Sequence, residues 1–247
     1  MSYIEKPNLP TSKLKSAIVA NADSKITEFI KSFGIELFYT ESNTDIDGSI
    51  AKHADINAFY IGNGKIVLDE SQKELKSFLT ERGISIIFPE KSVYGAYPGD
   101  CKLNCVALGN KIITRVASTD EYILNGFCAE NIINVNQGYA RCSVCIVNEN
   151  AVITDDVSIY KACLNHRIEA LLISKGNIAL PGHNYGFIGG ASSLIDKDKL
   201  IFFGDITKHI DYERIDIFLN KHGCKYEYLS NHNLTDIGGM ILIEEEK

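Results

Sequence analysis

Three segments of the chain share one pattern of apolar and polar positions, which predicts a helix followed by a strand. Residues 29–38, 78–87 and 218–227 each begin as an amphipathic helix end, pass through a glycine and continue as an apolar run. A glycine at this point suits the left-handed residue that commonly ends a helix. The pattern therefore predicts three helix–strand pairs at similar positions within a larger repeat.

A second pattern predicts pairs of strands joined by tight turns. Apolar runs flank short turns rich in glycine, asparagine or charged residues in four places: residues 58–68, 104–114, 145–154 and 193–203. Turns such as Asn63-Gly64 have the chemistry that β-hairpins require. Each of these segments is therefore predicted to be an antiparallel hairpin.

Together the two patterns define repeats of strand, turn, strand, helix and strand, each roughly 40 residues long. Four repeats follow one another, and the fifth is divided between the two chain ends, where 236–243 supplies the early strand. The complete set is 53–89, 97–136, 137–176, 186–229, and 236–243 with 12–39. This order predicts a single domain, 1–247, with a closed pseudo-five-fold α/β propeller fold rather than a doubly wound sheet.

Composition narrows the choice of partners. Hydrophobic residues make up 45% of the chain and charged residues 23%, which is ordinary for a globular protein. A formal net charge of -7 argues against nucleic acid and anionic membrane as partners. The sequence shows no apolar signal-peptide region and no apolar run long enough to span a membrane. We therefore expect a cytoplasmic protein with a small-molecule ligand, and the sequence leaves homo-oligomer formation open.

The seven cysteines are expected to be reduced thiols. The pairs Cys101 and Cys105, and Cys142 and Cys145, raise the alternative of a zinc site. However, each pair is predicted on or entering a strand, and no Cys/His pair with zinc-finger spacing follows. We therefore expect neither a metal nor a cofactor.

Five ββαβ repeats closed by the two chain ends resemble the pentein fold of the guanidine-modifying enzymes, which are arginine and agmatine deiminases, dimethylargininases and amidinotransferases. The architectural resemblance covers nearly the whole chain. The segment 53–59 stands where the family carries substrate-binding polar residues on a strand with Asp and Phe. Gly99-Asp100 stands where the family has Gly-Gly-Asp, whose aspartate belongs to the active site.

The sequence departs from the pentein pattern at the two residues that carry the chemistry. The family's nucleophilic cysteine follows Gly-Gly near the C-terminus, whereas this chain reads Gly238-Gly239-Met240 and has no cysteine after Cys224. The family's catalytic histidine opens the fourth repeat, where the nearest histidine here is His183 in the preceding loop. Attack on a guanidinium carbon needs a thiolate and an acid/base histidine. We therefore predict a divergent pentein that has lost or relocated this chemistry.

The resemblance implies that the early strands line a central channel and that their ends, with the following loops, form the ligand site. Arg141 in a buried strand would need a carboxylate partner such as Asp100, or an anionic ligand. Cys142 and Cys145, three residues apart, would point to opposite faces of that strand. Structural alternatives remain for every candidate: turn formation or capping for Asp100 and Asp236, close packing for the glycines, and an internal hydrogen bond for His183. The candidate ligand-binding residues are Asn104, Arg141, Ser143, Asn184, Tyr185, Gly190, Ser192 and Asp236.

Three functions are consistent with this pattern. The first is binding of a small polar ligand, with an amino, guanidino or carboxylate group, in the central channel without Cys–His catalysis. The second is an amidine or amide hydrolase with a relocated nucleophile, for which Cys142, His183 and Asp100 are the candidate catalytic residues. The third is a structural or assembly role, which would leave no open pocket.

Overall fold

The protein folds as five small sheets in the computed structural model, which describes residues 1–21 and 23–247. The four-stranded sheet has the order β1 (Ser2–Tyr3), β16 (Met240–Glu245), β2 (Leu14–Ala20) and β3 (Glu36–Thr40). The three-stranded sheets are β4 (Ala58–Gly62), β5 (Lys65–Leu68) and β6 (Ser85–Ile87); β7 (Val106–Leu108), β8 (Lys111–Thr114) and β9 (Ile132–Asn134); β10 (Val144–Asn148), β11 (Ala151–Thr154) and β12 (Glu169–Leu172); and β13 (Ser192–Asp196), β14 (Lys199–Phe202) and β15 (Lys225–Tyr228).

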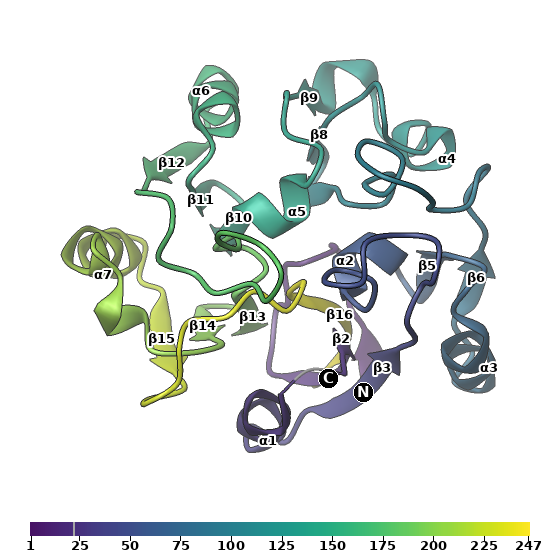
Figure 1. Ribbon diagram of the computed structural model, residues 1–247, viewed down its shortest axis with the longest axis horizontal. Helices are drawn as coiled ribbons and strands as arrows, with labels where there is room; N and C mark the ends of the chain where they lie inside the picture. The colour runs from purple at the N-terminus through teal and green to yellow at the C-terminus, as the bar shows by residue number, and fades with distance from the viewer. Residues whose placement is uncertain (22) are drawn as a thin grey trace.

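The sheets share one connectivity. In each, an antiparallel pair is followed by a third strand that runs parallel to the second, as in β4, β5 and β6. The parallel connection carries a helix, and these helices lie on the outside of the molecule, with the sheets arranged around its middle (Figure 1). They are α1 (Ser24–Lys31), α3 (Lys73–Glu81), α4 (Glu121–Leu124), α6 (Val157–Asn165) and α7 (Tyr212–Lys221), with the 3-10 turns η1 (Ala129–Asn131) and η2 (Ile206–Lys208). The predicted mixed α/β class is confirmed.

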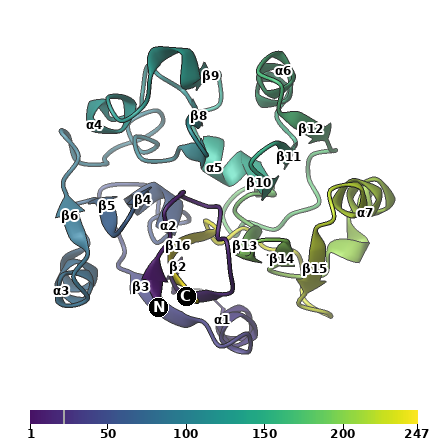
Figure 2. The ribbon, with the colours of Figure 1, turned by 180° about the vertical axis from the view of Figure 1, so that it is seen from behind.

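The four-stranded sheet joins the two ends of the chain. Strand β16 lies between β1 and β2, and Figure 2 shows the two termini close together. The carboxylate of Glu245 accepts hydrogen bonds from the backbone amides of Thr11 and Ser12. The predicted early strand at 236–243 is therefore present, but it begins later. Gly238 and Gly239 have φ values of 78° and 61°, so the segment before Met240 is irregular rather than a strand.

Local turn chemistry accounts for the hairpins and helix ends. Asn63 and Gly64 have φ values of 51° and 70°, which only a few residue types adopt readily. Gly34, Gly83 and Gly223 follow α1, α3 and α7 with φ values of 77°, 79° and 64°. The sequence-based predictions of a hairpin at Asn63-Gly64 and of glycine-terminated helices are confirmed.

Two short helices lie near the centre and were not predicted. Helix α2 (Ala54–Asn57) precedes β4, and α5 (Ala140–Ser143) precedes β10. The prediction that Cys142 lies on a strand is therefore wrong. The amides of Arg141 and Cys142 both donate to Oδ1 of Asn104, at 2.7 and 3.2 Å. Because this acceptor comes from a distant segment, no local pattern could reveal the helix.

The antiparallel strand pairs of the sheets are largely buried, and they supply much of the hydrophobic core together with the inner faces of the helices. Burial of these apolar side chains supplies the main driving force for folding. None of the helices in the described ranges has the length and apolar character that a bilayer span requires.

Candidate active site

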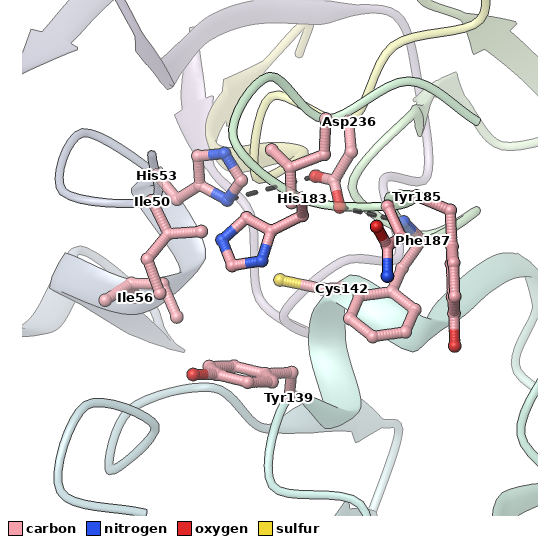
Figure 3. Close-up of a pocket in the computed structure, with 11 residues that line it drawn as sticks. Ile50, His53, Ile56, Tyr139, Cys142, His183, Tyr185, Phe187 and Asp236 are labelled. Carbon is pink, nitrogen blue, oxygen red and sulfur yellow. Dashed lines mark hydrogen bonds and ion pairs between the residues drawn. The ribbon is translucent and has the colours of Figure 1, made fainter. Parts of the chain in front are cut away.

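A pocket of about 260 Å³ opens between the segments that precede the first strands (Figure 3). Its walls are largely apolar and aromatic, and its polar atoms come from a thiol, two imidazoles, an amide, two phenols and a carboxylate. The lining residues are Ile50, His53, Ile56, Tyr139, Cys142, Leu180, His183, Asn184, Tyr185, Phe187 and Asp236.

Three of these side chains converge at the inner end of the pocket. One ring nitrogen of His53, Sγ of Cys142 and one carboxylate oxygen of Asp236 all lie within 4.8 Å of one another, and all three residues are buried. Nδ1 of His53 lies 3.9 Å from Oδ1 of Asp236. A thiol, an imidazole and a carboxylate at this separation can together support nucleophilic or acid/base chemistry. The same three groups are also suitable metal ligands.

The carboxylate of Asp236 is fixed by backbone amides. Its Oδ1 accepts from the amide of Gly238 at 2.9 Å, and its Oδ2 accepts from the amide of Phe187 at 2.9 Å. A Cβ atom at Gly190 would lie 1.8 Å from Oδ1 of Asp236. Gly190 therefore leaves the space that this carboxylate occupies, and it contributes to the site by its lack of a side chain.

The thiol of Cys142 is held by two polar neighbours. It donates to Oδ2 of Asp55 at 2.9 Å, and Nδ2 of Asn104 donates to Sγ at 3.3 Å. Burial, together with the nearby Asp55 and Asp236 carboxylates, raises the pKa of Cys142 well above its usual value. Burial also raises the pKa of Asp55 to about 6, against the opposing effect of His53 and Arg141. The Cys142 side chain is therefore a protonated thiol beside the carboxyl groups of Asp55 and Asp236.

Arg141 does not form the ion pair with Asp100 that the sequence offers as one of two alternatives. Its guanidinium donates to the backbone carbonyls of Gly189 at 3.1 Å and Met240 at 3.4 Å. Asp100 instead accepts from the phenol of Tyr139 at 2.6 Å. Because α5 directs Arg141 towards the carbonyl groups around Gly189, its charge is shared among backbone dipoles rather than paired with a carboxylate.

The predicted site residues divide into three groups. Those that line the pocket are Cys142, His183, Asn184, Tyr185 and Asp236. Three others support residues that line the pocket: Asp100 is hydrogen-bonded to Tyr139, Asn104 is hydrogen-bonded to Cys142, and Gly190 leaves room for Asp236. Those that do not line it and contact other parts of the interior are Arg141, Ser143 and Ser192. The hydroxyl of Ser192 donates to the carbonyl of Ile188.

His183 lies at the pocket but takes no part in the group around Cys142. Its Nε2 lies 2.6 Å from Oγ of Ser49, and its side chain is 41% exposed. The histidine beside Cys142 is His53, which the sequence-based interpretation did not select. Like Cys142, His53 and Asp55 lie just before the first strand of a hairpin. Their position relative to the hairpin is therefore the sequence signal that could identify them.

A buried carboxyl outside the pocket gives a pH prediction. Burial raises the pKa of Asp155 to about 6, and Lys175 opposes this effect. The unfolded-state value is about 3.9. The folded chain therefore binds the proton more tightly, and the free energy of unfolding falls as the pH rises from about 4 to about 6.

Asp155→Asn should remove this pH dependence and raise the free energy of unfolding by about 1–3 kcal/mol at neutral pH. Urea unfolding at a series of pH values measures the effect. Asp198→Asn, at an exposed hairpin turn, should change stability by less than about 0.5 kcal/mol. Equal pH dependence in the wild type and in Asp155→Asn would contradict the prediction.

The fold matches solved structures over nearly its full length. The amidinotransferase SxtG of Microseira wollei, from the saxitoxin biosynthetic pathway, is 8% identical with a TM-score of 0.64, and the match covers 99% of this chain and 98% of that one. Inosamine-phosphate amidinotransferase of Streptomyces griseus is 10% identical with a TM-score of 0.64, covering 100% and 98%. Agmatine deiminase of C. jejuni is 11% identical with a TM-score of 0.55, covering 93% and 94%.

The comparison with curated proteins finds no match. A family model described as a family of unknown function, DUF6873, matches residues 17–241. These structural neighbours are pentein-fold proteins, as the resemblance in the sequence indicated. The chain is thus a member of family DUF6873 with the pentein fold of the guanidine-modifying enzymes.

Proposed function

We propose that this protein is an enzyme that cleaves or transfers a C–N bond of a small cationic amidine or guanidine, with Cys142 as nucleophile and His53 as acid/base. The observation that carries the proposal is the convergence of His53, Cys142 and Asp236 within 4.8 Å at the inner end of a pocket. In this proposal the usual pentein pair has moved to other repeats, and Met240 stands after Gly238-Gly239, where the family has its cysteine.

The proposal includes a finer description of the fold. We infer that the five sheets close into a pseudo-five-fold propeller and that the whole chain is one domain. The pairing of β16 with β2 supports this inference, since it joins the two ends of the chain in one sheet. In such a ring the segments before β4, β10 and β16 meet at the centre, where the pocket lies.

The charge of the pocket favours a cation. Asp236 lines it, Asp55 lies directly against the thiol, and no lysine or arginine of the described residues lines it. A carboxylate ligand would meet two carboxyl groups without a counter-charge, whereas an amidinium would pair with them. The proposal therefore narrows the predicted polar ligand to a cationic one.

The chemistry follows from the contacts of Cys142. As Sγ attacks the central carbon, the thiol proton passes to Asp55, to which it is already hydrogen-bonded. The C=N electron pair moves to nitrogen and gives a neutral tetrahedral adduct. Protonated His53 then gives its proton to the departing nitrogen, the C–N bond breaks, and a cationic thiouronium remains on Cys142.

Regeneration requires water or an acceptor amine. Neutral His53 takes a proton from this second nucleophile as it bonds to the same carbon. With water, the C–S bond then breaks, the hydroxyl proton of the adduct passes to the sulfur, and the proton held by Asp55 leaves with the released amine as an ammonium ion. With an acceptor amine, the proton held by Asp55 returns to the sulfur and the released amine leaves neutral. For water the balance is guanidinium and water giving a urea and an ammonium ion.

A second candidate is binding of the same cation without turnover. It is favoured by the burial of Cys142, which is 3% exposed, and by the raised pKa of its thiol. A purely structural role has less support, because it predicts no open pocket, whereas these polar groups line one.

Release of amine from a panel of guanidines and amidines, with mass spectrometry of the quenched protein, tests the enzyme proposal. We expect release of amine and a thiouronium adduct on Cys142 with at least one compound. Cys142→Ser should lower turnover by at least about 1,000-fold. Cys145→Ser, which alters a buried cysteine that does not line the pocket, should retain it. Stabilisation by a ligand without turnover would support the binding candidate instead.

A further inference from the structure

We propose that His53, Cys142 and Asp236 form a zinc-binding site in the pocket. The three residues come from separate segments, and their ligand atoms lie within 4.8 Å of one another. Zinc bonds of about 2.0–2.3 Å in a tetrahedron place donor atoms roughly 3.3–3.7 Å apart. Small side-chain rotations therefore bring these donors into range.

Unpartnered polar atoms at the same place provide an independent argument. Nδ1 of His53 is buried without a hydrogen-bond partner and faces Oδ1 of Asp236 at 3.9 Å. Oδ1 of Asp55 is likewise buried and unpartnered. A buried polar atom without a partner costs about 1–3 kcal/mol. A cation between these groups would give His53 the partner that the protein itself does not supply.

The charges of the site also favour a dication. Two carboxyl groups and a thiol meet there, while the nearby Arg141 directs its guanidinium to backbone carbonyls. A bound dication would relieve the repulsion between the acidic groups and would hold the thiol in its deprotonated form.

The donor set selects the metal. Thiolate and imidazole together favour zinc over magnesium or calcium, which prefer oxygen ligands only. Three protein ligands beside an open pocket leave one position for water or another small ligand. This site is not the zinc site considered from the two cysteine pairs in the sequence. Of Cys101, Cys105, Cys142 and Cys145, only Cys142 belongs to the group of metal-ligating side chains found among residues 1–21 and 23–247.

Titration of the chelator-treated protein with Co²⁺ and Zn²⁺ tests the inference. We expect one ion per chain, a thiolate-to-cobalt charge-transfer band, and displacement of cobalt by zinc measured against a chromophoric chelator. Cys142→Ser should remove the band and weaken zinc binding by at least about 100-fold, since it removes a direct ligand. His53→Ala should also weaken zinc binding, although this variant keeps every cysteine, including the exposed Cys128.

Cys128→Ser and Cys145→Ser are the matched controls, and both should keep the band. A band that survives in Cys142→Ser but disappears in Cys128→Ser would overturn the inference, as would the absence of cobalt binding to wild type. Circular dichroism shows whether each variant is folded, and His53→Ala tests the site if Cys142→Ser is not. The metal readouts need no substrate, so failure of the enzyme proposal and failure of the zinc site are separate results.

Discussion

The ratio of the alkylation rate by chloroacetamidine, a cation, to that by neutral chloroacetamide should be about 10 to 100 times higher at Cys142 than at Cys128. The reason is that Asp55 and Asp236 lie beside the Cys142 thiol, and a unit charge within several ångströms of a carboxylate gains a few kcal/mol in a protein environment. Cys128 is exposed, and solvent there screens any such preference. Peptide mapping by mass spectrometry over a time course gives both rates from one sample.

Two variants separate charge from access. Asp236→Asn keeps the shape of the pocket and should reduce the preference for the cation, whereas Cys128→Ser should leave the Cys142 ratio unchanged. Equal ratios at the two cysteines would mean that the pocket does not select cations, and the guanidine proposal would lose its electrostatic basis.

Gly190→Ala should destabilise the protein by about 3 kcal/mol and displace the Asp236 carboxylate. The added Cβ would lie 1.8 Å from Oδ1 of Asp236, closer than any packing arrangement allows. Overpacking a buried site usually costs 1–3 kcal/mol, and Asp236 would also lose its bonds to the amides of Gly238 and Phe187. Urea unfolding measures the loss, and the cation preference at Cys142 reports the displacement.

Gly48→Ala is the matched control, since a Cβ at Gly48 meets no atom within 4 Å. It should change stability by less than about 1 kcal/mol. If both variants were equally stable, Asp236 would have room to move, and the arrangement of the site would be less constrained than its contacts indicate.

The parts of the fold that the sequence predicted are those set by nearby residues. The hairpin at Asn63-Gly64 follows from turn geometry, and the helix that ends before Gly223 follows from an amphipathic period and a glycine. The repeat of these patterns was enough to indicate a pentein-like α/β fold and to identify β16 as a strand that pairs near the N-terminus.

The site was only partly predictable, because its geometry depends on contacts between distant segments. The sequence points to Cys142 and Asp236 by their positions, but to His183 rather than His53, and the ion pair that it allows between Arg141 and Asp100 does not form. The orientation of Cys142 depends on α5, and α5 is held by the side chain of Asn104. No periodicity near residue 142 contains that information.

The pairing of β16 with β2 also sets the order in which the protein can form. Thr11 and Glu245 are hydrogen-bonded although they are 234 positions apart. During synthesis, strand β2 leaves the ribosome long before its antiparallel neighbour exists, so this sheet must remain unfinished while the others assemble. Asp236 lies only a few residues before β16, so it is synthesised just before the strand that completes the sheet. A nascent chain would therefore carry the Cys142 thiol without the Asp236 carboxylate, and the site would be complete only when the last strand docks.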